Sequence, residues 1–296
     1  GEYHPERPDR LRAILAALDD EAFAGLTRLV APPATLEQLT RVHPAAFVET
    51  ILGIRPPQGE IVMIDGDTAM SAGSAEAALR AAGAVVAGVD AVFKGTARNA
   101  FAAVRPPGHH ATPDVPGGFC LFNNVAIGAM HARAVHGVEK IAILDFDVHH
   151  GQGTQAVVGP DARLFYGSTH QSPLYPGTGS AREHGIDGNV VNVPLAPGSG
   201  GADFRDAWEG RILPKLDSFA PELLIVSAGF DAHRLDPLAQ LNLEVADFTW
   251  LTDALLDIAK RHAEGRLVSA LEGGYDLDAL AASVAAHVKA LMRTGA

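Results

Sequence analysis

The chain has 296 residues, 47% of them hydrophobic and 20% charged, which suits one large globular α/β domain. Its net charge of −12 argues against direct nucleic-acid binding, because phosphate contacts need a basic surface. The same charge favours a cationic substrate. The single cysteine, Cys120, excludes an intramolecular disulfide and predicts a cytoplasmic protein. No signal peptide or transmembrane-length apolar run is recognisable, so we expect no membrane association.

The first hundred residues predict mainly helices. Apolar residues recur at helical spacing over 9–18, and a second amphipathic helix is expected from about 36 to 52. We expect Ser74 to cap a long alanine-rich helix that ends near Phe93. Residues 61–64 form either a short strand or a loop segment.

From about residue 100, predicted strands alternate with predicted helices. The strands are expected at 101–104, 141–144, 164–166, 190–193, 223–226 and 267–271, and the helices at about 124–136, 202–219, 246–262 and 277–292. Strand–helix alternation predicts a mainly parallel sheet covered by helices on both faces. Because no internal repeat or linker interrupts this pattern, the sequence predicts a single domain over residues 1–296.

The predicted strand at 141–144 leads into three residues with metal-binding side chains. Asp145, Asp147 and His149 alternate along the chain, so on an extended strand they would line one side. Buried carboxylates without a cationic partner are costly, which favours a metal site. The alternative interpretation is a turn with a salt-bridged aspartate and surface histidines.

Chemically active residues also follow three other predicted strands. These residues are His109 and His110, Asp231, and Tyr275. Taken singly, each has a structural explanation: a histidine pair in the core, a helix cap, a packed tyrosine. In open α/β sheets, however, ligands bind beyond the carboxyl ends of the strands. We therefore expect the four clusters to meet in one site.

Six sequence segments resemble those of the zinc-dependent histone deacetylase family. They are HPERPDRL (4–11), RPPGHHA (105–111), GGFC (117–120), DFDVHHGQGT (145–154), SAGFD (227–231) and LEGGY (271–275). Their details look class II-like, the branch that also holds bacterial deacetylase-like amidohydrolases and acetylpolyamine amidohydrolases. The resemblance implies an arginase-like, three-layer α/β/α fold with a parallel sheet of about eight strands. It also implies that a strand normally preceding the first segment is missing from this chain.

The resemblance implies two kinds of metal site. A catalytic Zn²⁺ would be held by Asp147, His149 and Asp231, which leaves a position open for water and substrate. Iron would suit the same mixed oxygen and nitrogen ligands. A structural K⁺ would be held by residues at the ends of two strands: Asp145, Asp147, His149, Ser168 and Thr169. A second K⁺ site would draw on Val158, Asp161, Leu164 and Asn189.

The catalytic roles also come from the resemblance. His110 would be the general base that later protonates the leaving amine, with His109 as its electrostatic partner, oriented by Asp145. Gln152 stands where class I members have an aspartate facing the second histidine. A neutral partner should lower the pKa of His110. Tyr275 would donate its hydroxyl to the oxyanion.

Five further residues would bind substrate by the same resemblance. Phe119 and Tyr175 would form the walls of a tunnel for the lysine methylenes, and the carbonyl of Gly118 would accept the amide N–H. Leu238 is the residue found in lysine deacetylases, where polyamine-specific relatives have a glutamate. Asp67 is either the rim carboxylate that grips the substrate backbone or an ordinary loop aspartate.

The sequence therefore predicts a zinc-dependent amidohydrolase that removes acyl groups from lysine ε-amines, in proteins or in small acylated amines. An acetylpolyamine amidohydrolase is the alternative that the acidic charge favours and Leu238 opposes. A manganese ureohydrolase would need two metals and more bridging aspartates. An inactive ligand-binding relative is the non-enzymatic alternative, and the sequence leaves a homo-oligomer open.

Overall fold

The computed structural model describes residues 3–293, and its centre is a six-stranded parallel sheet. In spatial order the strands are β3 (Asn99–Ala102), β8 (Leu267–Leu271), β7 (Leu223–Ala228), β4 (Ile141–Asp145), β5 (Leu164–Gln171) and β6 (Val190–Leu195). Every neighbouring pair is parallel. The predicted α/β fold with a parallel sheet is confirmed.

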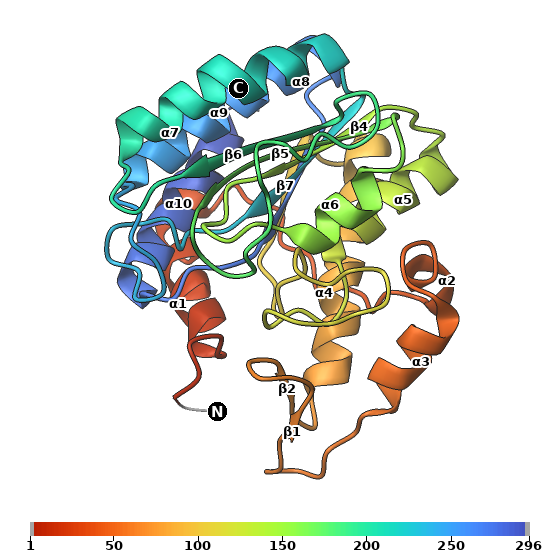
Figure 1. Cartoon of the computed structure of the whole chain (residues 1–296). Coiled ribbons are helices and arrows are strands. Elements are labelled where there is room, and N and C mark those ends of the chain that lie inside the picture. Colours follow the sequence, from red (N-terminus) through yellow and green to blue (C-terminus); the bar gives the residue numbers. More distant parts are fainter. Residues whose placement is uncertain (1–2, 294–296) are drawn as a thin grey trace.

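Helices cover both faces of the sheet (Figure 1). One layer holds α4 (Ser74–Phe93), α5 (Asn124–His136) and α6 (Gln152–Val158), and the other holds α1 (Asp9–Leu18), α7 (Gly201–Ala207), α8 (Leu213–Phe219), α9 (Val245–His262) and α10 (Leu277–Arg293). In β4, Ile141 and Ile143 pack in the core beside α4 and α5, while Ala142 and Leu144 pack in the core of the opposite face. Both faces of the strand are buried, and this explains its continuous apolar sequence.

Two predicted helices differ from the observed ones. The helix expected over 36–52 is divided into α2 (Leu36–Leu39) and α3 (Ala45–Gly53), with Pro44 at the N-cap of α3. A proline disfavours helical geometry in the residue before it, so the helix cannot run through this position. The helix expected over 202–219 contains a π-helical segment, η2 (Trp208–Ile212), between α7 and α8.

Two details of the N-terminal half also differ. A parallel sheet of about eight strands was expected, and the main sheet has six; β1 (Val62–Met63) and β2 (Ala69–Met70) form a separate antiparallel pair. Ser74 does not cap α4: the N-cap is Gly73, and Ser74 is the first helical residue. The Ser74 hydroxyl instead accepts a hydrogen bond from the Ser71 N–H at 2.9 Å. A short 3₁₀ helix, η1 (Glu21–Phe23), follows α1.

The strand register brings the polar segments to one edge of the sheet. Asp145, the last residue of β4, lies opposite Ser168 of β5 and Ser227 of β7. On the far side of β7, Ala228 lies opposite Leu271 of β8. The loops that follow these strands therefore leave the sheet side by side. Among residues 3–293, no helix is long and apolar enough to cross a membrane.

Substitution of Gly128 tests the packing of α5 on α4. A Cβ at this position would lie 2.5 Å from Cγ1 of Val85 on α4. Gly128→Ala should therefore lower the free energy of unfolding by about 1–3 kcal/mol, despite the better helix propensity of alanine. Gly210→Ala, where a Cβ meets nothing within 4 Å, should be neutral or slightly stabilising. Urea denaturation of both variants measures the difference, and equal stability would contradict the close packing.

Candidate active site

Asp147, His149 and Asp231 form a cluster at the carboxyl edge of the sheet. Their ligand atoms lie within 4.8 Å of one another, and all three residues are buried. Nδ1 of His149 is 3.1 Å from Oδ1 of Asp147 and 3.1 Å from Oδ2 of Asp231. The alternation of Asp145, Asp147 and His149 had suggested one extended strand. Strand β4 ends at Asp145, however, so Asp147 and His149 lie in the loop that follows it. The loop still brings the two side chains together.

Backbone N–H groups hold the two carboxylates in place. The N–H of Val148 donates to Oδ1 of Asp231 at 2.8 Å, and the N–H of Gly273 donates to Oδ2 of Asp147 at 2.8 Å. Each carboxylate is thus oriented by a loop from a different strand. Such contacts fix the direction of metal ligands in protein sites.

The charges of the cluster favour a bound cation. Burial acts to lower the pKa of His149, but the carboxylates of Asp147 and Asp231 raise it to about 10. Burial and the charge of Asp147 raise the pKa of Asp231 to about 6. Two buried carboxylates thus attract positive charge to this point, and a metal ion bound by the neutral imidazole could supply it in place of the His149 proton. The two oxygen ligands and one nitrogen ligand fit zinc or iron and leave a coordination position open.

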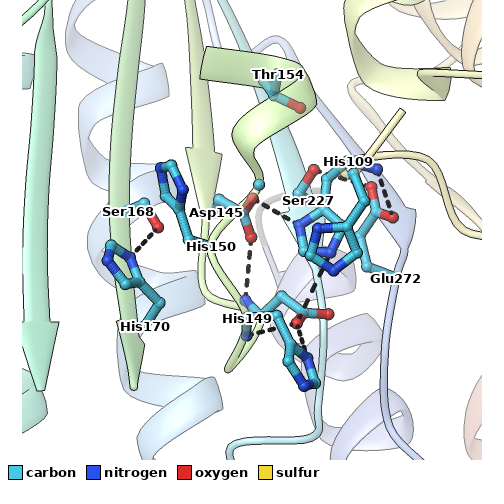
Figure 2. A network of polar contacts seen from close by, with 12 residues as sticks. His109, Asp145, His149, His150, Thr154, Ser168, His170, Ser227 and Glu272 are labelled. Atoms are coloured by element: carbon cyan, nitrogen blue, oxygen red, sulfur yellow. Dashed lines mark hydrogen bonds and ion pairs between the residues drawn. The ribbon is translucent and has the colours of Figure 1, made fainter. Parts of the chain in front are cut away.

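His109 and His110 lie beside this cluster in the loop after β3. Their ring centroids are 4.0 Å apart. Nδ1 of His109 is 2.9 Å from Oδ2 of Asp145 (Figure 2), and Nδ1 of His110 is 2.7 Å from Oε1 of Gln152, the first residue of α6. Both predicted contacts are therefore present.

The two histidines have opposite pKa shifts. Burial would lower the pKa of His109, but Asp145, Asp147 and Glu272 raise it well above its usual value. Burial lowers the pKa of His110 well below its usual value, and the charge of His109 lowers it further. The hydrogen bond to Gln152 acts in the opposite direction, so burial, and not the neutral partner, is the main cause of the lowered pKa of His110. His110 is thus a neutral imidazole beside a cationic one.

Tyr275 lies at the end of the loop after β8. Its N–H donates to Oδ2 of Asp236 at 2.8 Å, and its ring lies 4.9 Å from the guanidinium of Arg10. Burial, with the nearby charges of Asp231 and Asp147, raises the pKa of the Tyr275 hydroxyl well above its usual value. The hydroxyl therefore stays protonated and can donate a hydrogen bond.

The predicted tunnel residues gather around the histidines. Gly118 and Phe119 both have positive φ, 55° and 69°. A Cβ at Gly118 would overlap the ring of His110 and lie 2.9 Å from the ring of Tyr175, so only glycine fits there. Tyr175 lies 5.0 Å from His110 between ring centroids, and Phe119 lies 5.9 Å from Tyr275.

Asp67 and Leu238 lie on loops that hydrogen bonds connect to these residues. The Thr68 hydroxyl donates to Oδ1 of Asp67 at 2.8 Å and accepts from the Phe119 N–H at 3.1 Å. The N–H of Leu238 donates to Oδ1 of Asp236 at 3.0 Å, and the other oxygen of Asp236 holds Tyr275. One intermediate residue therefore connects Asp67 to Phe119 and Leu238 to Tyr275.

The first predicted potassium site stays a prediction, although two of its side chains lie on neighbouring strands. Asp145 and Ser168 lie opposite each other on β4 and β5, and both are fully buried. Thr169 follows, with its hydroxyl accepting from Nε1 of Trp208 at 3.1 Å. Buried oxygen atoms around a carboxylate are the ligands that hard cations such as K⁺ prefer.

The second predicted potassium site does not fit the structure. Nδ2 of Asn189 lies 2.9 Å from the carbonyl oxygen of Val158, 3.0 Å from that of Asp161 and 2.9 Å from that of Leu164. A side-chain amide thus occupies the point where these carbonyls converge. The two hydrogens of this nitrogen can satisfy two of the three carbonyl oxygens, so the Asn189 amide competes with a cation for this point.

A second group of possible metal ligands lies between α4 and α5. Oδ1 of Asp90 is 2.8 Å from Nε2 of His131 and 2.8 Å from Nε2 of His136. Arg41, however, lies 2.7 Å from Nδ1 of His131, and this arginine can only donate. Nδ1 is therefore an acceptor and Nε2 carries the proton that contacts Asp90. The group is a hydrogen-bonded ion-pair network.

Sequence reasoning assigned no role to several residues that support the site. The Tyr166 hydroxyl donates to Oδ2 of Asp145 at 2.9 Å, the same oxygen that faces His109. Nε of Arg10 donates to the Gly274 carbonyl at 2.7 Å, and Asp236 holds Tyr275. Glu272 accepts hydrogen bonds from the loop that carries His109. Arg10 and Glu272 lie within the quoted segments, which was the available signal.

Comparisons with known proteins agree with this geometry. The family model described as "Histone deacetylase domain" matches residues 4–291. The chain is 42% identical to a histone deacetylase-like amidohydrolase of Pseudomonas aeruginosa, over 92% of this chain and 72% of that one. It is 40% identical to histone deacetylase 14, chloroplastic, of Arabidopsis thaliana, over 98% of this chain and 73% of that one. A crystal structure of the HDA15 HD domain superimposes with a TM-score of 0.92 at 39% identity, covering 98% of this chain and 82% of that chain. The chain belongs to the histone deacetylase family.

Proposed function

We propose that this protein is a zinc-dependent amidohydrolase that removes acetyl or other acyl groups from lysine ε-amines, in proteins or in small acylated amines. The observation that carries the proposal is the convergence of the Asp147–His149–Asp231 cluster with His110, a neutral imidazole. The His110 and His149 ring centroids are 5.9 Å apart. The single six-stranded sheet that carries the loops of this site supports one catalytic domain.

The chemistry that zinc supplies when bound by Asp147, His149 and Asp231 is polarisation of the amide carbonyl and a lower pKa for the attacking water. His110 is neutral, so it can take the proton from that water and later give it to the departing amine. His109 stays charged because it lies against Asp145, and its charge lowers the pKa of His110. Asp145 also belongs to the proposed K⁺ site, which would hold the end of β4.

The remaining residues bind and orient substrate. Tyr275 carries a protonated hydroxyl that can donate to the oxyanion as negative charge develops. Phe119 and Tyr175 enclose the lysine methylenes, and the carbonyl of Gly118 accepts the amide N–H. Asp67 at the rim holds the substrate backbone.

An acetylpolyamine amidohydrolase is the second candidate, and the net charge of −12 favours it. Leu238 favours lysine, because a residue without charge at the tunnel mouth adds no attraction for a second ammonium group. Relative kcat/KM values on an acetyl-lysine peptide and on N-acetylspermidine distinguish the two. Cleavage of the polyamine alone would contradict the lysine assignment, and no cleavage of any acyl amide would support an inactive relative.

Replacement of Tyr275 tests the oxyanion role. Tyr275→Phe removes only the hydroxyl, so kcat should fall about 10²–10³-fold while zinc content and KM stay near wild type. Tyr3→Phe is the matched control, since Tyr3 is 98% exposed, and it should leave kcat unchanged. Steady-state kinetics and elemental analysis measure both effects. Zinc loss in Tyr275→Phe would show a structural role instead.

Replacement of Gln152 tests the general base. Glutamate at this position would place a negative charge against His110 and raise its pKa. The base must be neutral to act, so activity is lost as pH falls through that pKa. Gln152→Glu should therefore move the acidic limb of the kcat/KM profile to higher pH, by about one unit, whereas Gln152→Met should not raise it. An unmoved limb in the glutamate variant would contradict His110 as the base.

Metal content tests the ligand set. Wild-type protein should bind one zinc or iron ion per chain in the cluster, and chelation should abolish activity until the metal is restored. Asp231→Asn should lose this metal, because a neutral amide is a weaker ligand than a carboxylate. Asp90→Asn in the ion-pair network should retain it. Two manganese ions per chain, measured by elemental analysis, would favour the ureohydrolase interpretation.

A further inference from the structure

Glu272 is a fully buried carboxylate directly after β8. Oε2 accepts hydrogen bonds from the N–H of Gly108 at 2.6 Å and from the N–H of His109 at 3.2 Å. Oε1 accepts from the hydroxyl of Ser227 at 2.9 Å. Figure 2 shows Glu272 beside His109, with its carboxylate at the backbone of the histidine loop. One side chain thus connects the loops after β3 and β8 to strand β7.

The partners of Glu272 indicate what it does. Its hydrogen bonds come from two backbone N–H groups and one hydroxyl, and the loop partner Gly108 is 164 residues away in sequence. Burial of a carboxylate is costly, and these three donors offset that cost only while the loop keeps its conformation. The carboxylate and the loop conformation therefore depend on each other.

The loop has little room to move around this anchor. A Cβ at Gly108 would lie 2.6 Å from the backbone nitrogen of Asn124, so α5 closes one side. The carbonyl of His109 accepts from the N–H of Thr154 at 3.1 Å on α6. Glu272 supplies the acceptor for the N–H groups of the same loop. Together these contacts determine the direction in which the His109 and His110 side chains leave the backbone.

We propose that Glu272 is a positioning residue that sets the catalytic histidine pair by holding the N–H groups of Gly108 and His109. The inference rests on the proposed function, because it assumes that His110 acts as a base. Catalysis requires the base to lie within a few tenths of an ångström of its productive place, so a loop displaced by removal of this acceptor should react more slowly. Substrate binding along the tunnel, which Glu272 does not touch, should change little.

Three substitutions of Glu272 separate the effect of its hydrogen bonds from the effect of its charge. Glu272→Gln keeps one oxygen for the two N–H groups, and its amide can donate to Ser227, whose hydroxyl also accepts. Activity should therefore stay near wild type. Glu272→Met keeps the size but has no strong acceptor, and kcat should fall about 10–100-fold with KM within about twofold. Glu272→Asp keeps the charge but is one methylene shorter, and it should lose kcat as Met does.

Ser269→Ala is the matched control. Ser269 lies three positions earlier, in strand β8, and is fully buried; its hydroxyl is 2.8 Å from Nε2 of His287. Loss of this hydroxyl should lower the free energy of unfolding without changing kcat. If Glu272→Met fails to fold, the Asp and Gln variants alone decide: equal kcat in both would overturn the proposal.

Amide hydrogen exchange gives a readout independent of activity. The N–H groups of Gly108 and His109 should exchange faster in Glu272→Met than in wild type or Ser269→Ala. If wild type is active and Glu272→Met shows unchanged exchange and unchanged kcat, the positioning role is overturned. A metal-loaded wild type that cleaves no acyl amide would contradict the proposed function instead. Faster exchange in Glu272→Met of that protein would still show that Glu272 holds the loop.

Discussion

The rest of the site depends on two carboxylates, Asp147 and Asp231, buried together around His149. Burial, together with the negative charge of Asp147, raises the pKa of Asp231, as expected for two like charges in one protein interior. The N–H groups of Val148 and Gly273 hold both acids in place in spite of their repulsion. A cation is the simplest compensation, and the parallel sheet supplies the geometry because its strands all end at this edge.

The second determinant is an asymmetry between two adjacent histidines. His109 faces a carboxylate, Asp145, and His110 faces a neutral amide, Gln152. One imidazole is therefore charged and the other neutral although their ring centroids are 4.0 Å apart. The charged ring of His109 lowers the pKa of His110. The protonation state of His110 therefore depends on Asp145, which keeps His109 charged. In the proposed mechanism, His109 would supply electrostatic stabilisation and His110 would transfer protons, both from one loop.

Local sequence patterns predicted the regular elements best. The helix at 9–18 and the strand at 267–271 have the predicted bounds. The helix buries one face and the strand is buried throughout, so the spacing of apolar residues indicates each element. The predictions were wrong for two helices that are not continuous. Pro44 divides one helix, and the π-helical segment Trp208–Ile212 interrupts the other. Residues 61–64 were left undecided between strand and loop because a strand of two residues carries no periodicity.

The sequence by itself identified the family and the candidate active-site residues, since Asp147, His149, Asp231, the histidine pair and Tyr275 each lie in a short segment with a recognisable pattern. Only the tertiary structure decided how they are held. Asn189 occupies the place of an expected cation, and Glu272 supports a loop that is 164 residues away in sequence. Such roles depend on hydrogen-bond directions between distant segments. These directions exist only after the strands have aligned, so no local pattern records them.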